Sequence, residues 1–263
     1  MFRLTREVRF AINGADDPQL GGKPTNGYAG FPSLTHWGPH LSLRVTLSGP
    51  LDPVSSYLIN IKQIDAAVRE RTVPMVAAAV CGQQSQTPAQ LVGRLYQMLD
   101  AWPPLTVEKL RLNLSPFVAF TACPSEMPMI RLSQKFEFSA THRLHSLKAS
   151  EEENRRLFGK CNNPHGHGHN YELEVTLRGE PDQNGLLIAI PHFERIVAAT
   201  VIDRFDHKNL NVELPEFREL VPTVENIAMT IYRLLKPKFE EQRAQLASVT
   251  IWETPKTWCE YYE

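Results

Sequence analysis

Apolar and polar residues alternate in three short stretches of the second half of the chain. They are residues 136–140 (FEFSA), 171–177 (YELEVTL) and 249–253 (VTIWE). Because successive side chains of a strand point to opposite faces of a sheet, this alternation predicts three half-buried strands.

Apolar residues three and four positions apart predict two helices between the second and third of these strands. The first is expected over residues 191–202, which begin with a proline, a residue suited to the first turn. The second is expected to begin at Thr223, its N-cap, and to close at Pro237. Ser150 and Glu153 have the spacing of a capping box and predict one further short helix.

The first half of the chain resembles the second half at four places in the same order, which indicates an internal repeat. The offset between matching residues lies between 128, from Phe2 to Ile130, and 139, from Leu110 to Val249. Residues 123–128 contain two prolines and are the expected seam. The matching segments are 2–10 with 130–138, 40–49 with 170–179, 87–99 with 223–235, and 110–114 with 249–253.

These elements predict an α+β fold made of two tandem units. Each unit is expected to hold an antiparallel four-stranded sheet with two helices on one face. The expected first unit covers residues 1–125, and the expected second unit covers residues 129–263.

Composition narrows the class of protein without pointing to an activity. Of the 263 residues 42% are hydrophobic and 22% are charged, and the net charge is −1, so neither nucleic acid nor a membrane is an expected partner. No apolar run approaches the roughly 18 residues of a spanning helix, and residues 1–7 lack the apolar stretch of a signal peptide. The four cysteines lie far apart with no CxxC pair, so a cytoplasmic protein is expected.

Three histidines form a candidate metal site. His167 and His169 lie two residues apart at the start of an expected strand, so both side chains can reach one ion. A catalytic zinc site needs three protein ligands, and the upstream candidate at the end of an expected strand is His142, just after the strand 136–140. Neutral nitrogen ligands favour zinc over magnesium or calcium. On spacing alone, a surface histidine cluster that binds metal adventitiously explains residues 165–169 as well.

Cys161 lies six residues before His167 among polar neighbours, which indicates partial exposure. A nearby cation would favour its thiolate, which can act as a base or a nucleophile. Asp206 and His207 are an acid–imidazole pair that could relay a proton to such a thiol. A buried cysteine and a turn are the simpler explanations of the same residues.

Glu253 shares a strand face with the apolar residues Val249 and Ile251, where a carboxylate needs a partner. A guanine-like or pterin ring presents two parallel N–H donors and would supply that partner. Glu225 has a simpler explanation, because an acidic residue in the first turn of a helix favours the helix dipole.

Taken together, these residues resemble the 6-pyruvoyltetrahydropterin synthase family over about residues 130–263. The resemblance implies the tunnelling fold, in which subunits assemble side by side into a β-barrel, and the internal repeat extends this fold to both tandem units. The matching segments are 138–144 (FSATHRL), 158–171 (FGKCNNPHGHGHNY), 206–210 (DHKNL), 223–226 (TVEN) and 252–254 (WET).

The resemblance implies one zinc ion per chain, in the second half, with a catalytic centre beside it. Cys161 matches the catalytic cysteine, and its two partners, Asp206 and His207, come from a neighbouring subunit in the family. His165 matches no ligand of the family. The implied zinc ligands are His142, His167 and His169.

The resemblance also implies that three residues bind the substrate. Glu253 matches the residue that anchors the pterin ring, and Thr223 and Glu225 belong to a motif that contacts the substrate. Val224 replaces a hydroxyl-bearing residue of that motif, and Thr141 stands where serine is usual.

The implied reaction converts 7,8-dihydroneopterin triphosphate to 6-pyruvoyltetrahydropterin with loss of triphosphate, which Mg²⁺ can accompany. Cys161 would take and return protons. The related 6-carboxytetrahydropterin synthases of the queuosine pathway act on the same substrate and typically have a shorter gap between cysteine and histidines, so residues 162–164 favour the pyruvoyl product. A non-catalytic pterin-binding protein is the alternative of another class, but the second half retains all six chemical positions, which argues against it.

The first half of the chain lacks the residues that carry this chemistry. We therefore expect residues 1–125 to be a structural unit that has kept the fold but not the catalytic activity. A separate binding pocket around His36, Trp37 and His40 is the weaker expectation for this half. In the repeat alignment the positions opposite His142, His167, His169 and Glu253 are Gly14, Trp37, Pro39 and Leu114.

The expected assembly is a homo-oligomer, because the catalytic cysteine would need residues from another chain. We expect a trimer in which three second halves form one barrel and three first halves form another barrel stacked on it.

Overall fold

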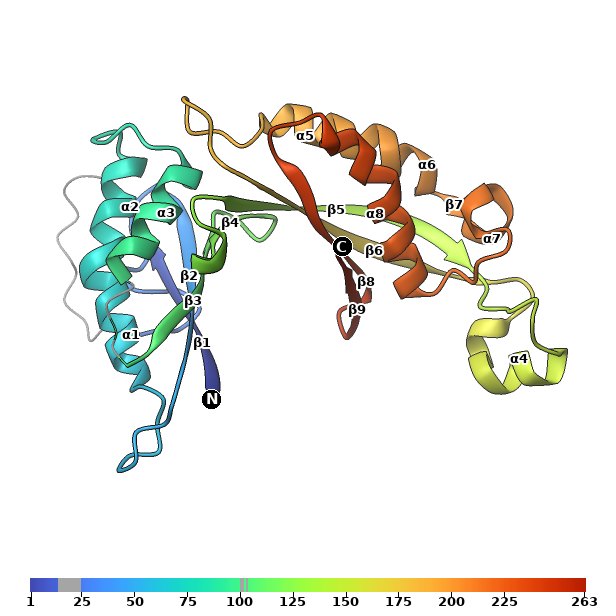
Figure 1. The fold of residues 1–263 in the computed structure, drawn as a ribbon, viewed down its shortest axis with the longest axis horizontal. Helices are drawn as coiled ribbons and strands as arrows, with labels where there is room; N and C mark the ends of the chain where they lie inside the picture. Colours follow the sequence, from blue (N-terminus) through green and yellow to red (C-terminus); the bar gives the residue numbers. More distant parts are fainter. Residues whose placement is uncertain (14–24, 100–101, 103) are drawn as a thin grey trace. The chain divides into compact units, whose positions relative to one another are not determined.

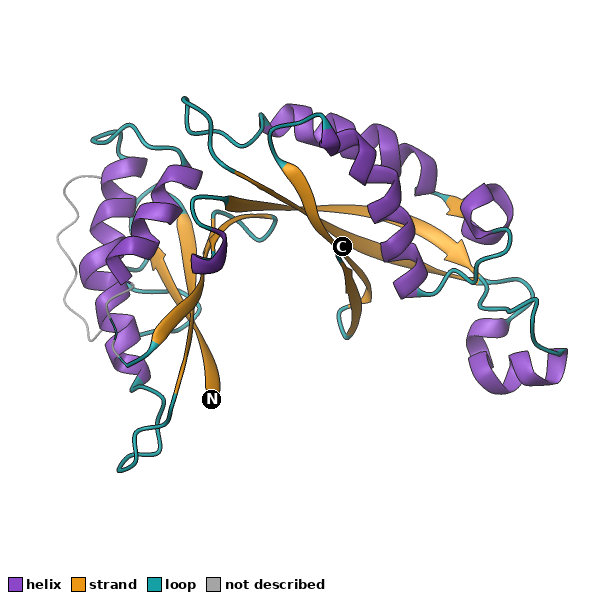
Figure 2. Ribbon diagram, viewed as in Figure 1, coloured by secondary structure: helices purple, strands orange, loops and turns teal. Residues whose placement is uncertain are grey.

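The computed structural model describes residues 1–13, 25–99, 102 and 104–263, so the alignment position Gly14 lies outside the described residues. The chain divides into two compact units. Unit 1 comprises Met1–Ser133 and Gly179–Leu187, and unit 2 comprises Gln134–Arg178 and Ile188–Glu263. Figures 1 and 2 show the helices and strands of both units.

Unit 1 contains an antiparallel sheet whose strands follow one another in chain order, β1-β2-β3-β4. Its longer helices lie on one face of this sheet (Figure 1). The elements are β1 (Phe2–Ala11), β2 (His40–Gly49), α1 (Ile61–Ala67), η1 (Val68–Thr72), α2 (Val73–Val80), α3 (Pro88–Leu99), β3 (Thr106–Asn113), β4 (Val118–Ala122) and η2 (Pro124–Glu126).

Unit 2 contains a sheet with the strand order β5-β6-β8-β9, and the two-residue strand β7 pairs with β5 in parallel. Helices α5, α6 and α8 cover one face of the sheet (Figure 1). The elements are β5 (Ile130–His142), which begins in unit 1, α4 (Glu151–Phe158), η3 (Gly159–Asn162), β6 (His167–Gly179), α5 (Ile190–Val197), η4 (Ala198–Ile202), α6 (Asp203–Phe205), β7 (Lys208–Asn209), α7 (Leu210–Glu213), η5 (Pro215–Phe217), α8 (Val224–Glu240), β8 (Gln245–Thr254) and β9 (Thr257–Tyr261).

The predicted α+β class, with antiparallel strands and helices packed against them, is confirmed. The capping box of Ser150 and Glu153 is present at the start of α4. The short strands β4 and β9 were not assigned to residues by the sequence pattern. They pair with β3 and β8 respectively.

Aromatic side chains form the part of the core that lies under the ends of β5 and β6. The rings of Phe138 and Tyr171 stack with centroids 5.1 Å apart, and Phe205 meets Phe138 edge-on at 5.6 Å. All three side chains are at most 3% exposed. Burial of each contributes about 1.5–3 kcal/mol, so this cluster holds the two strands together next to the histidines.

One helix end differs from the sequence prediction. Helix α8 was expected to close at Pro237, but it continues to Glu240 with that proline inside. A proline there removes one N–H donor and crowds the preceding turn. Phe239 offsets this cost, because it is fully buried and its ring meets that of Phe193 edge-on at 5.8 Å.

The strands of unit 1 and of unit 2 share a bulge at matching positions. The β2–β3 register shifts at the step from Thr46 to Leu47, and the β6–β8 register shifts at the step from Thr176 to Leu177. These steps are 130 residues apart (176 − 46). A bulge increases the local twist of a strand, so both units twist at the same point along their second strand.

The helices that follow the second strand of each unit also match. Each contains a π-helical segment, η1 in unit 1 and η4 in unit 2, and these begin 130 residues apart (198 − 68). Beside these helices, the guanidinium of Arg6 donates two hydrogen bonds of 2.8 Å to Asp65. At the corresponding place in unit 2, Nε2 of Gln134 donates to Glu194 at 2.7 Å. A polar contact between first strand and helix is therefore common to both units.

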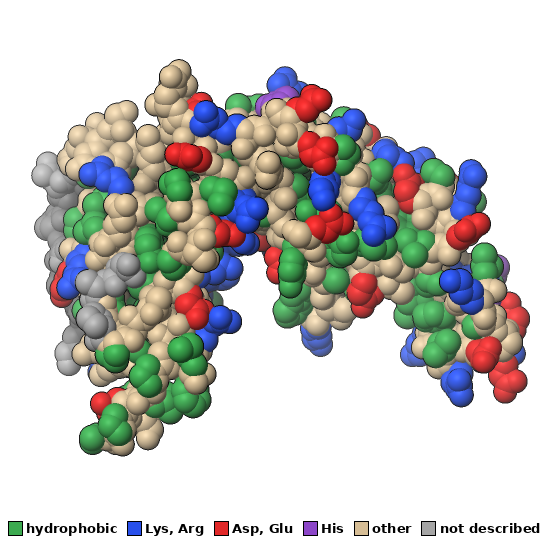
Figure 3. Space-filling model, in the orientation of Figure 1, with side chains coloured by type: hydrophobic (Ala, Val, Ile, Leu, Met, Phe, Trp, Pro, Cys, Tyr) green, Lys and Arg blue, Asp and Glu red, His purple; other side chains and the backbone are tan. Residues whose placement is uncertain are grey.

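Charge is spread widely over the surface of the protein. In Figure 3 acidic and basic side chains are interspersed over the face shown, in keeping with the net charge of −1. Within the described ranges, no helix combines the length and apolar character needed to cross a membrane.

Candidate metal centre

Three histidines meet where β5 ends and β6 begins. His142 is the last residue of β5, and His167 and His169 are the first and third residues of β6. Since side chains two apart on a strand face the same way, both β6 histidines point to one side of the sheet. The candidate ligand atoms of the three residues lie within 4.8 Å of one another, and Nε2 of His142 is 3.1 Å from Nε2 of His167. The structure thus brings together all three predicted ligands.

A backbone contact orients His142. Its Nδ1–H donates to the carbonyl oxygen of Pro222 at 2.7 Å, a tautomer that leaves the Nε2 lone pair facing His167. Two imidazole lone pairs 3.1 Å apart repel each other unless a proton or a cation lies between them. Nε2 of His169 is buried and has no hydrogen-bond partner in the described part of the chain. A cation would satisfy these atoms together.

Burial favours the neutral form of two of these imidazoles. His142 is fully buried, and burial lowers its pKa to about 4. Burial also lowers the pKa of His169. The neutral imidazole is the form that binds a metal, so these two side chains are in their metal-binding form at neutral pH.

The donor set fits zinc. Three neutral imidazole nitrogens and one open position are the ligand pattern of many catalytic zinc sites, and these ligands suit magnesium or calcium poorly. His142 also has the outer contact typical of a metal-bound histidine, because its second ring nitrogen donates to a backbone carbonyl.

Glu253 lies beside the three histidines. It belongs to β8, which pairs with β6, and its Oε1 is 3.3 Å from Nε2 of His142 and 3.5 Å from Nε2 of His169. The side chain is 21% exposed, so the carboxylate can be reached from solvent. A ring bound there could donate two N–H groups to it.

Tyr171 lies at the site, although the sequence analysis gave it no role beyond its place in a half-buried strand and in the matching segment 158–171. It is two residues beyond His169 on the same face of β6, and its hydroxyl lies 3.4 Å from Nδ1 and 3.5 Å from Nε2 of His142. The alternation of β6 predicts this shared face, so the pattern contained the signal. The buried phenol therefore contacts His142 from within the core.

Cys161 lies in η3, the short turn that follows α4, and is partly exposed. Its carbonyl oxygen accepts a hydrogen bond from the N–H of Leu144, two residues beyond His142. This hydrogen bond ties the cysteine turn to the segment that directly follows His142. Burial and the negative charge of Glu253 raise the pKa of Tyr171 well above its usual range.

Asp206 and His207 lie between α6 and β7. Oδ1 of Asp206 accepts the N–H of Ser139 at 2.8 Å, and Oδ2 lies 2.8 Å from Nδ1 of His207. These two contacts lower the pKa of Asp206, so it is ionised at neutral pH. The imidazole is 83% exposed and borders an open pocket of about 580 Å³. In the described residues of one chain, no hydrogen bond or ion pair links this pair to Cys161.

The start of α8 lies next to the centre through Pro222, the acceptor for His142. Thr223 caps the helix, with its hydroxyl oxygen accepting the N–H of Asn226 at 3.4 Å. Glu225 is exposed in the first turn, and no hydrogen bond or ion pair joins it to the histidines in the described part of the chain. Thr223 directly follows Pro222, whose carbonyl contacts His142, whereas Glu225 lies two residues further into the helix.

The described part of the first half shows no comparable group of metal-binding side chains. His36 and His40 are exposed, and Trp37 is fully exposed rather than packed into a pocket. Leu114 stands at the position matched with Glu253.

Comparison with known proteins places this centre in a family. The family model described as 6-pyruvoyl tetrahydropterin synthase matches residues 131–263, half of the chain. A Poecilia reticulata protein named 6-pyruvoyl tetrahydrobiopterin synthase is 47% identical over 96 residues, 36% of this chain and 65% of its own length, just under two thirds. A Haemophilus influenzae protein named 6-carboxy-5,6,7,8-tetrahydropterin synthase is 26% identical over 156 residues, 51% of this chain and 100% of its own length.

A solved structure agrees with the sequence match. The structure of Caenorhabditis elegans 6-pyruvoyl tetrahydropterin synthase is 40% identical in sequence with a TM-score of 0.50, and the match covers 52% of this chain and 98% of that chain. The chain belongs to the 6-pyruvoyl tetrahydropterin synthase family and is an enzyme of that kind.

Proposed function

We propose that unit 2 is a zinc-dependent lyase that converts 7,8-dihydroneopterin triphosphate to 6-pyruvoyltetrahydropterin with release of triphosphate. The observation that carries this proposal is the cluster of His142, His167 and His169, whose ligand atoms lie within 4.8 Å of one another and whose partner contacts suit zinc. The names of the relatives support the same reaction class.

Cys161 is the proposed proton carrier of the reaction. Bound zinc would polarise the hydroxyls of the substrate side chain and acidify the neighbouring C–H bonds. Cys161 would accept a proton from one carbon and return it to another, as general base and then general acid. Its backbone carbonyl accepts the N–H of Leu144, two residues beyond His142, which supports a position beside the centre.

Asp206 and His207 are proposed to assist Cys161 of another subunit. The ionised carboxylate holds Nδ1 of His207, which leaves Nε2 free to exchange a proton. The 83% exposure of the imidazole suits a group offered to a partner chain. The active form would then be a homo-oligomer, and the trimer expected from the sequence stays a prediction.

Glu253 is the proposed anchor for the pterin ring, with Thr223 and Glu225 as further substrate contacts. The carboxylate of Glu253 lies within 3.5 Å of two zinc-ligand nitrogens, so a ring held there would place its side chain next to the metal. The position of Thr223 directly after Pro222 supports its role, whereas that of Glu225 rests on the motif alone.

Unit 1 is proposed to be a copy of unit 2 that keeps the fold without the chemistry. The shared order of strands and helices supports this origin, and so do the bulges and π-helical segments spaced by 130 residues. The positions opposite His167, His169 and Glu253 hold Trp37, Pro39 and Leu114 in unit 1, none of which binds zinc or anchors a pterin.

A second candidate is the formation of 6-carboxytetrahydropterin from the same substrate. The Haemophilus influenzae relative with that name supports it. Two observations favour the pyruvoyl product instead. The 47% identity to a pyruvoyl-named relative exceeds the 26% to the carboxy-named one, and residues 162–164 lengthen the gap between Cys161 and the histidines.

The deciding experiment is anaerobic incubation of the zinc-loaded protein with 7,8-dihydroneopterin triphosphate and Mg²⁺, with products identified by mass spectrometry. Triphosphate and 6-pyruvoyltetrahydropterin are expected, and a Cys161→Ala variant is the control. Acetaldehyde and the carboxy product would move the chain to the second candidate. Tight binding of zinc and pterin without turnover would instead indicate a pterin-binding protein, and the role of Cys161 would be withdrawn.

A further inference from the structure

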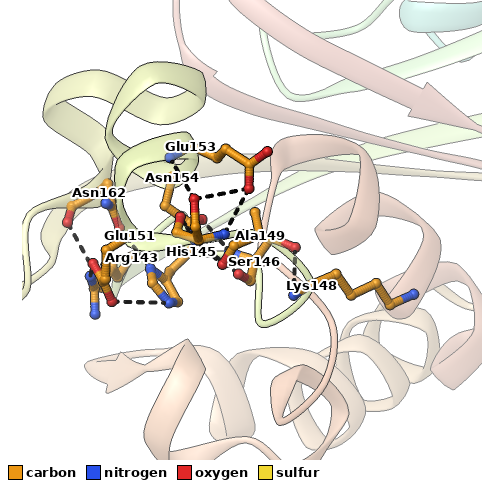
Figure 4. A network of polar contacts seen from close by, with 10 residues as sticks. Arg143, His145, Ser146, Lys148, Ala149, Glu151, Glu153, Asn154 and Asn162 are labelled. Atoms are coloured by element: carbon orange, nitrogen blue, oxygen red, sulfur yellow. Dashed lines mark hydrogen bonds and ion pairs between the residues drawn. The ribbon is translucent and has the colours of Figure 1, made fainter.

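The segment from Arg143 to Asn162 leaves the sheet directly after His142 and carries Cys161 next to its end. Polar contacts hold this segment in place (Figure 4). Asn162 lies at the point where the two ends of the segment meet. Its side chain is polar, yet the residue is only 5% exposed, so its partners must compensate for the loss of water.

Asn162 receives hydrogen bonds from both of the charged or ionisable side chains that follow His142. Its Oδ1 lies 3.1 Å from Nε of Arg143 and 3.0 Å from Nδ1 of His145, and both nitrogens donate. Its backbone carbonyl accepts a further bond from Nε of Arg143 at 3.2 Å. One step earlier, the carbonyl of Cys161 accepts the N–H of Leu144 at 2.9 Å. Residues 161 and 162 are thus both tied to residues 143–145.

The other end of this connection is fixed to the fold. The N–H of Arg143 donates to Oδ1 of Asn211 at 2.7 Å, and Nδ2 of Asn211 donates back to the carbonyl of Arg143 at 3.0 Å. Asn211 belongs to α7. Since Arg143 also follows a residue of β5, it is held by both the strand and the helix and can serve as a rigid support.

The outer part of the segment has its own support and does not depend on Asn162. Asn154 is fully buried, and its amide donates to the carbonyls of Ser146, Ala149 and Ser150 while accepting the N–H of Ser146. Glu151 lies at longer range, 3.8 Å from His145 and 4.0 Å from Arg143. Removal of the Asn162 side chain should therefore leave α4 folded and loosen only the turn that holds the cysteine, which keeps its backbone bonds to Arg143 and Leu144.

We propose that Asn162 is a positioning residue for Cys161, acting as the shared acceptor that locks the cysteine turn onto Arg143 and His145. The inference rests on the proposed role of Cys161 in proton transfer. A reacting group displaced by about 1 Å can lose on the order of 100-fold in rate, so a side chain that never touches the substrate can control turnover.

The test compares Asn162→Leu with Asn162→Asp. Leucine has a similar volume and removes the acceptor, whereas aspartate keeps an oxygen for both donors. Asn184→Leu is the matched control, because Asn184 is exposed and lies in unit 1. Three quantities are measured on zinc-loaded protein: zinc per chain, hydrogen–deuterium exchange of the peptide that contains Leu144, and kcat and KM with the pterin triphosphate.

In Asn162→Leu we expect wild-type zinc content, at least about tenfold faster exchange at Leu144, and a fall in kcat of roughly 10- to 100-fold with KM within about threefold of wild type. Asn162→Asp is expected to stay within about threefold of wild type in all three. Wild-type exchange and kcat in Asn162→Leu would overturn the inference. It would also fail if the aspartate variant were as impaired as the leucine variant, or if the leucine variant lost its zinc.

A milder variant covers the case in which Asn162→Leu does not fold. His145→Phe removes one of the two donors to Asn162, and it should speed exchange at Leu144 by a smaller factor; unchanged exchange there would refute the inference. Exchange and zinc content do not depend on activity. If the wild-type protein has no turnover but exchange responds as expected, the proposed function fails, while the structural role of Asn162 in holding the cysteine turn is supported. If turnover is present and the variants behave as wild type, only the positioning role fails.

Discussion

Acidification should destabilise the metal-free protein through His142. The imidazole is fully buried with a pKa lowered from 6.5 to about 4, whereas in the unfolded chain it keeps its ordinary value. Between these two values the unfolded chain binds a proton that the folded protein does not accept. This contribution to stability is therefore complete above pH 6.5 and is lost as the pH falls towards 4.

The size of the effect follows from the two pKa values. At pH 5 protonation lowers the free energy of the unfolded chain by about 2 kcal/mol, and that of the folded protein by less than about 0.1 kcal/mol. The free energy of unfolding should consequently fall by about 2 kcal/mol between pH 7.5 and pH 5 through His142 alone. The full effect, below pH 4, is about 3 kcal/mol.

Urea unfolding in the presence of EDTA, at pH 7.5 and pH 5, measures this loss. Other groups titrate over the same range, so the comparison is with His142→Gln, which should lose about 2 kcal/mol less than the wild type. His165→Gln is the control, because His165 is exposed and its removal should leave the wild-type pH dependence. An equal pH dependence in the wild type and His142→Gln would show that the buried imidazole is not held neutral, and the argument for a preformed metal centre would fall.

Further outcomes are expected at other positions. Cys161→Ala should bind one zinc per chain by elemental analysis and lose at least about 100-fold in kcat. Mixing refolded Cys161→Ala and His207→Ala subunits should restore measurable turnover if the pair acts across chains, and no recovery would place both groups in one chain. Tyr171→Phe should weaken zinc binding by about tenfold in a chelator competition, because the hydroxyl contacts His142. Unchanged affinity would show that this hydroxyl does not support the metal ligand. Phe239→Ala should lower the free energy of unfolding by about 3–5 kcal/mol in urea, and a loss below about 1 kcal/mol would show that Phe239 does not hold the last turn of α8.

Local patterns in the sequence predicted much of the fold. Alternation identified the strands that carry the centre, because a half-buried strand imposes a period of two whatever its neighbours are. Capping residues identified the starts of α4 and α8, since the unpaired N–H groups of a helix end select few side chains. The end of α8 was wrong by a turn, because burial of Phe239 outweighs the local effect of Pro237 and no local rule contains that burial.

Spacing identified the histidines as candidates and the resemblance to the family implied their roles, but neither predicted the residues that support them. The contact of Asn162 with Arg143 joins residues 19 positions apart around a loop, and such a closure leaves no periodic signal. The hydroxyl of Tyr171 was equally hidden, since alternation gives the face of a residue but not the atom that it meets. The separation of Asp206 from Cys161 depends on the path of the chain between α6 and β7.

The π-helical segments η1 and η4 have a consequence for how mutations in this protein should be interpreted. Such segments often mark functional sites, because an extra residue in a helix turn is usually costly. Here one lies in the unit that holds the histidines, and the other lies in the unit whose described residues hold no such group. Under the proposal that unit 1 keeps the fold without the chemistry, a costly feature shared by both units belongs to the architecture. Features common to both units would then report what folding demands, and features confined to unit 2 would report what catalysis adds.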